Sequence, residues 1–155
     1  MKTKNLFFQD FKTLVHSRVF VFYIAYLYHM KQTFPKEEKL KSKILIGQLF
    51  EEGKSVKSFP LKLIYHAIQG EESQDKVGVS VPKRNFKLAV TRNRIKRLLR
   101  ENYRKQKNLL PPHVNKFSMM FIYTGRKELD YNEIEIAMRK LIHKFIEKEL
   151  TDDAL

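Results

Sequence analysis

One segment in the middle of the chain carries the residues best suited to chemistry, and that chemistry is the binding of anions. Over Ala89–Lys107 a helical period of ~100° per residue separates an apolar side, with Ile95, Leu98 and Leu99, from a polar one. A merely solvated helix face would interleave Glu with Lys, whereas this face has only Glu101 near its cations. The outward arc is predicted to hold Arg92, Asn93, Lys96, Arg97, Arg100, Arg104 and Lys107.

The composition of this arc favours phosphate as the anion. Arginine outnumbers lysine in it, and the planar guanidinium group binds phosphate oxygens in pairs and stacks on bases. Lys83 and Arg84, just before the segment, are predicted to extend the same surface. The whole chain has 31 Lys and Arg against 17 Asp and Glu, a formal net charge of +14, which favours nucleic acid first and acidic membrane surfaces second.

Residue patterns of enzymes and metal proteins are not found in the sequence. It has no cysteine, so disulfides, thiolate metal sites and cysteine nucleophiles are excluded, and a cytoplasmic protein is expected. The five histidines include no pair at i, i+4, and there is no Gly-rich phosphate loop, nucleophile elbow or close pair of hydrolytic carboxylates. We therefore expect no catalytic side chain and no metal or other cofactor bound by the protein alone.

The surrounding pattern predicts the elements that position the basic segment. A short helix is expected from about Ser42 to Gly53, strands over Phe59–Ala67 and Val77–Val81, and a buried central strand over Phe117–Tyr123. Asp130 and Glu133 resemble a capping box before a last amphipathic helix. The polar stretch 69–75 is interpreted as a hairpin connection. The order helix, strand, strand, helix, strand, helix predicts an α+β fold in which helices pack on a small sheet.

The first 29 residues differ from the rest. Residues 19–28 are almost all apolar or aromatic, but ~10 residues are too few to span a bilayer. We expect residues 1–29 to be an extension, either upstream sequence before a natural start at Met30 or a peripheral amphipathic helix. Residues 30–155 are expected to form one domain, with its core at about 34–146 and no membrane association.

The basic segment and the strand before it resemble a known family. The run Val79-Ser-Val-Pro-Lys-Arg84, followed after a short gap by Ala89-Val-Thr-Arg-Asn-Arg-Ile-Lys-Arg-Leu-Leu-Arg-Glu101, is similar to the RNR signature of the bacterial ribonuclease P protein subunit. Further similarity lies in Leu40–Gly53 and Tyr123–Lys127. The resemblance implies a fold like the second domain of ribosomal protein S5, with a left-handed β-α-β crossover, against the usual hand of such connections.

The resemblance also implies a function. The family assists a catalytic RNA, whose bound Mg²⁺ ions activate water to remove the 5′ leader of precursor tRNA. The expected partners are therefore that RNA and precursor tRNA, with one protein monomer per RNA. Residues matching the RNA-binding signature are Lys83, Arg84, Arg92, Asn93, Arg94, Lys96, Arg97 and Arg100, and Arg104 continues the same arc.

A leader-binding cleft is implied between the first helix and the sheet. Phe50 matches a family phenylalanine there, whereas Ile46 stands where another aromatic is common, and Lys62 and Ile64 stand where a tyrosine is frequent. With fewer aromatic platforms, the cleft is expected to stack fewer bases while keeping its contacts to the RNA backbone. Two alternatives for the whole protein stay open: a ribosomal or other structural RNA-binding protein, and a stand-alone nuclease, for which the required carboxylate cluster is missing.

Overall fold

The computed structural model describes residues 33–70, 72, 74–110 and 115–149. The chain divides into two units, 1–33 and 34–155, and the elements below all belong to the second. The predictions made for residues 1–29 and for a start at Met30 lie outside the described residues.

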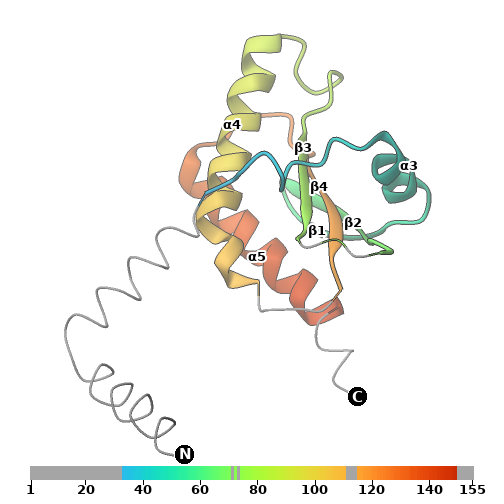
Figure 1. Cartoon of the computed structure of the whole chain (residues 1–155). Coiled ribbons are helices and arrows are strands. Elements are labelled where there is room, and N and C mark those ends of the chain that lie inside the picture. Colours follow the sequence, from blue (N-terminus) through green and yellow to red (C-terminus); the bar gives the residue numbers. More distant parts are fainter. Residues whose placement is uncertain (1–32, 71, 73, 111–114, 150–155) are drawn as a thin grey trace, which may run out of the picture. The chain divides into compact units, whose positions relative to one another are not determined.

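Within these ranges a four-stranded sheet lies between one helix on one face and two on the other (Figure 1). The strands are β1 (Lys54–Ser58), β2 (Leu61–Ala67), β3 (Lys76–Ser80) and β4 (Phe117–Tyr123), and the helices are α3 (Lys43–Glu51), α4 (Ala89–Gln106) and α5 (Tyr131–Glu149). A short 3₁₀ turn, Lys107–Leu109, follows α4. The predicted α+β class is confirmed.

The sheet has the order β1-β2-β4-β3. β1 pairs with β2 and β2 with β4 in antiparallel fashion, while β3 and β4 are parallel neighbours joined by α4. The β-α-β crossover is therefore present, and its left hand stays a prediction. The prediction that residues 69–75 form a hairpin connection is wrong, because β4 lies between β2 and β3; the hairpin of this sheet joins β1 to β2.

Two clusters of buried side chains hold the layers together. The larger one lies between the sheet and helices α4 and α5, and alternate residues of β2, among them Leu61, Leu63 and Tyr65, point into it. The smaller one consists of Leu40, Leu49, Ile64 and Met120 and lies between α3 and the opposite face of the sheet. Because β2 and β4 contribute to both clusters, the sheet is buried on both faces along its centre.

The ends of the helices agree with their sequence signals. Ser42 accepts a hydrogen bond from the Leu45 amide at the start of α3. A Cβ at Gly53 would collide with the carbonyl oxygen of Leu49, so the chain can turn out of this helix there only with glycine. At α5, the Glu133 amide donates to Asp130 Oδ1 at 2.8 Å and the Asp130 amide donates to Glu133 Oε2 at 3.1 Å, which confirms the capping box.

Candidate RNA-binding surface

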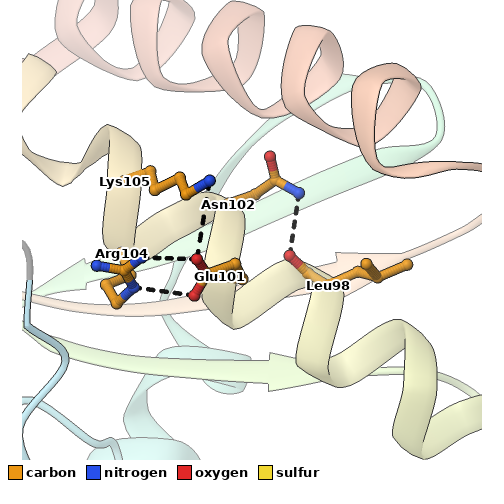
Figure 2. A network of polar contacts seen from close by, with 5 residues as sticks. All are labelled: Leu98, Glu101, Asn102, Arg104 and Lys105. Atoms are coloured by element: carbon orange, nitrogen blue, oxygen red, sulfur yellow. Dashed lines mark hydrogen bonds and ion pairs between the residues drawn. The ribbon is translucent and has the colours of Figure 1, made fainter.

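Helix α4 presents two chemically different sides, as its sequence predicts. Ile95, Leu99, Asn102, Tyr103 and Gln106 are buried against the rest of the domain. Asn93, Arg94, Arg97 and Arg100 are exposed, and Lys96 is partly exposed. The Asn102 amide donates to the Leu98 carbonyl within its own helix (Figure 2), and the Gln106 amide donates to the Glu135 carbonyl of α5.

The cations of the predicted arc fall into two groups. In the part of the chain that the structure describes, Lys96, Arg97 and Arg100 have no carboxylate within ion-pair distance. Arg104 is paired instead: its Nη2 lies 2.6 Å from Glu101 Oε1, and Lys105 Nζ lies 3.9 Å from the same oxygen (Figure 2). The Arg104 hydrogen bond is the main reason why the pKa of Glu101 is lowered and that of Arg104 is raised. The middle of the helix therefore carries three cations that are available to a polyanion.

Two further cations, Arg94 and Arg92, are held by neighbouring segments. Arg94 Nε lies 3.0 Å from Glu128 Oε1 but keeps 72% of its side chain exposed, so it can still reach a ligand. Arg92 Nη1 donates to the carbonyl oxygens of Phe86 and Lys87, at 2.9 and 2.6 Å.

Lys107 does not face outward as its position in the helical period predicted. Its ammonium group lies 2.7 Å from Glu38 Oε1, with only 13% of the side chain exposed, so the expectation that it faces outward is wrong.

The turn between β3 and α4 places Lys83 and Arg84 beside the helix. Both side chains are exposed, and the amides of Asn85 and Phe86 close the turn on the Pro82 carbonyl. The Asn85 side chain then ties the turn to the end of β4, since its Nδ2 donates to the Thr124 and Gly125 carbonyls at 3.2 and 3.1 Å. Leu88, at the start of α4, has no side-chain acceptor for the first amides of the helix, which leaves a positive helix end next to these cations.

A cavity of about 930 Å³ lies between α3, the sheet and this turn, where the leader cleft was predicted. Among the described residues its lining combines three cations, one exposed aromatic ring and no carboxylate: Phe50, Lys62, Ile64, Pro82, Arg84, Asn85, Ile122, Thr124 and Arg126. We call this cavity the candidate cleft. Phe50 keeps 54% exposure and is therefore no core residue, whereas Ile64 is 9% exposed and belongs to the smaller cluster while also lining the cavity.

Three of the four predicted cleft residues line the candidate cleft, and one does not. Phe50, Lys62 and Ile64 are brought together, but Ile46 does not line the candidate cleft and instead packs against the smaller cluster under α3. Arg126 was missed as a cleft residue, although it lies in the Tyr123–Lys127 stretch that follows the central strand. Its place beside Arg84 comes from β4 and β3 being parallel neighbours, a pairing that the local pattern did not show.

Other features of the described residues bear on function class. They include no group of three or more histidine and acidic side chains arranged to hold a metal ion. Among the same residues, no helix has the length and apolar character needed to cross a bilayer.

Comparison with known proteins identifies the family. Residues 34–146 match the family model described as Ribonuclease P. The ribonuclease P protein component of Porphyromonas gingivalis is 34% identical over 110 residues, which cover 68% of this chain and 80% of that protein. The protein component of Dictyoglomus thermophilum is 33% identical over 112 residues, covering 72% and 91%.

Solved structures show the same fold. The RNase P protein of Staphylococcus aureus superposes with a TM-score of 0.58 at 22% identity, over 70% of this chain and 94% of that one. The RNase P protein of Thermotoga maritima superposes with the same TM-score at 20% identity, over 69% and 96%. A family match over residues 34–146, relatives above 30% identity and this shared fold agree, and the chain belongs to the ribonuclease P protein family.

Proposed function

We propose that this protein is the subunit of a ribonuclease P ribonucleoprotein that binds the catalytic RNA with α4 and holds the 5′ leader of precursor tRNA in the candidate cleft. The observation that supports this best is the position of Arg84. It belongs to the basic turn that continues onto α4, and it also lines the candidate cleft. One continuous basic surface therefore adjoins both the helix and the cleft.

The two parts of this surface suit different RNA. Lys96, Arg97 and Arg100 have no ion-pair partner among the described residues and lie on one rigid helix, so they suit the fixed array of phosphates on a folded RNA. The candidate cleft has one exposed ring, Phe50, and cations on its walls, which suits a single strand whose bases can turn toward the protein. We therefore assign the helix to the catalytic RNA and the cleft to the leader.

Hydrolysis itself is assigned to the RNA. Mg²⁺ ions bound by the RNA would activate the attacking water and stabilise the leaving oxygen. The protein's residues would contribute by positioning: the helix cations join it to the RNA, and the cleft holds the leader near the scissile bond. We further propose one protein monomer per catalytic RNA, and a cytoplasmic location stays a prediction. A role as a ribosomal or other structural RNA-binding protein is not favoured, because the family match covers both the helix and the cleft.

A cleavage assay tests this function. Precursor and mature tRNA are titrated against a bacterial ribonuclease P RNA with and without the protein, at several Mg²⁺ concentrations. The protein is expected to tighten binding of precursor over mature tRNA and to lower the Mg²⁺ concentration needed for half-maximal cleavage. No effect on either quantity, with the protein shown to be folded and bound to the RNA, would contradict the proposal. Co-purification with ribosomal subunits instead of a catalytic RNA would favour the alternative.

A further inference from the structure

A second cavity, smaller and more apolar, adjoins the candidate cleft. It measures about 380 Å³ and lies where the β1–β2 turn meets the loop after β4. We call it the turn pocket and define it by its lining among the described residues: Phe59, Pro60, Tyr123, Thr124, Gly125, Arg126, Lys127 and Leu129. Of these residues, only Thr124 and Arg126 also line the candidate cleft, and the others were assigned no function above.

The walls of the turn pocket are fixed before any ligand arrives. The Thr124 amide and hydroxyl both donate to the Pro60 carbonyl, at 2.7 and 2.9 Å, which joins the β1–β2 turn to the end of β4. The Tyr123 hydroxyl donates to the Lys127 carbonyl at 2.6 Å and so holds the loop after β4 against the end of that strand. A Cβ at Gly125 would lie 2.9 Å from Tyr123 Cε1 and 3.1 Å from Pro60 Cβ, so only glycine allows these segments to approach so closely.

Phe59 gives this pocket an unused aromatic face. Its side chain is 80% exposed, more than that of any other large apolar residue the structure describes. A single exposed ring is common on protein surfaces and by itself indicates nothing. This ring, however, borders a preformed apolar cavity with Arg126 and Lys127 at its rim, so a ligand could bury both the ring and the cavity wall. Both cations are exposed and have no ion-pair partner among the described residues.

The combination of flat apolar walls and cations at the rim matches a nucleotide. The base has two π faces that stack on an aromatic ring, and the phosphate is anionic. A pocket of about 380 Å³ has room for one base. An apolar peptide side chain would use the walls but leave the two cations without a role, in a protein of net charge +14.

The turn pocket is also continuous with the candidate cleft, because Thr124 and Arg126 line both. A strand held in the cleft next to Phe50 can therefore pass Arg126 and reach Phe59 without leaving the protein surface. We propose that the turn pocket binds the base of one unpaired leader nucleotide, stacked on Phe59, while Arg126 contacts the backbone between the cleft and the pocket. This inference rests on the proposed function of the candidate cleft.

The test uses the holoenzyme with precursor tRNAs whose leaders grow by one nucleotide at a time. With the wild-type protein, affinity is expected to rise in a step at the leader length that first reaches the turn pocket. In Phe59→Ala this step should disappear, a loss of roughly 5- to 150-fold from the removal of one stacked base. Phe59→Tyr keeps a flat ring and should retain the step. Ile136→Ala removes another exposed apolar side chain, from α5, and serves as the matched control.

Each other outcome overturns the inference in a defined way. An unchanged step in Phe59→Ala excludes stacking on this ring. Equal weakening of precursors with short and long leaders, or of the catalytic RNA without substrate, would show that the pocket binds another part of the complex. If the wild-type protein fails to favour precursor over mature tRNA at every leader length, the proposed function itself fails. Circular dichroism on each variant ensures that lost binding is not lost folding.

Discussion

The guanidinium group of Arg92 is bonded to the chain that leads into its own helix, with Nη1 2.9 Å from the Phe86 carbonyl oxygen. A second bond from the same nitrogen reaches the Lys87 carbonyl at 2.6 Å. A residue of the RNA-binding signature thus also fixes the entry of α4. Its neighbours on the arc, Lys96, Arg97 and Arg100, have no such bonds among the described residues.

Arg92→Ala is therefore expected to destabilise the protein, unlike other changes on the arc. Loss of the two hydrogen bonds should cost about 1 kcal/mol in the free energy of unfolding, or roughly 4 °C in Tm for a domain of this size. Arg92→Lys keeps one donor and should lose less. Thermal unfolding followed by circular dichroism measures both. A Tm for Arg92→Ala equal to that of Arg97→Ala would show that the bonds to Phe86 and Lys87 contribute nothing.

The unpaired arc cations should act on RNA binding and not on folding. Lys96→Ala, Arg97→Ala and Arg100→Ala are each expected to change stability by no more than about 0.5 kcal/mol. Each should weaken assembly with the catalytic RNA and reduce the slope of log K against log salt by ~0.7–0.9. Lys140→Ala, which removes an exposed cation from α5, is the control. Cleavage at saturating protein and raised Mg²⁺ should survive, and a rate near zero there would require a catalytic side chain.

Glu101 is expected to restrain RNA binding. Glu101→Gln removes the carboxylate that holds Arg104, so assembly with the catalytic RNA should strengthen about two- to five-fold, while the protein becomes slightly less stable. Because Arg104 lowers the pKa of Glu101, the ion pair contributes to stability above the ordinary carboxylate range and is lost only as the pH falls through the lowered value. The gain in affinity should therefore be the same at pH 8 and pH 5. A gain that fades by pH 5 would contradict this assignment.

Phe50 is expected to contact the leader. Phe50→Ala should weaken binding of precursor tRNA more than of mature tRNA, by up to ~3 kcal/mol if one base stacks on the ring. Since the ring is 54% exposed, folding should be little affected. Ile44→Ala on the same helix removes a more exposed apolar side chain that does not line the candidate cleft, and it is the matched control. Equal losses for the two RNAs would assign Phe50 a structural role.

Elements with a strong local signal were predictable from the sequence. The bounds of β4 were predicted as observed, and α4 and the capping box of α5 agree closely, because each has a clear period or a defined end. β1 was missed because Lys54–Ser58 is a polar strand at the edge of the sheet, with Val56 as its one large apolar residue. The order of the strands was not predictable, since β4 enters the sheet between two strands that precede it.

The candidate site shows the same limit. The helical period predicts which side chains point away from the core, but not which other segments of the chain they contact. Glu38, which lies 69 residues earlier in the chain, forms an ion pair with Lys107, and only the tertiary fold brings the two residues together. Likewise Arg126 joins the cleft through the pairing of β3 with β4. Contacts of this kind depend on topology and leave no local pattern.

The lysines at the end of α5 have a consequence for how the protein behaves at high concentration. Lys144 and Lys148 donate to the Lys57 and Ser55 carbonyls of β1, the strand at one edge of the sheet. At the opposite edge, Val77 of β3 exchanges hydrogen bonds with the backbone of Glu38 and Leu40. A strand from another copy would have to displace these bonds at either edge before it could extend the sheet. The fold of the free protein thereby resists edge-to-edge aggregation.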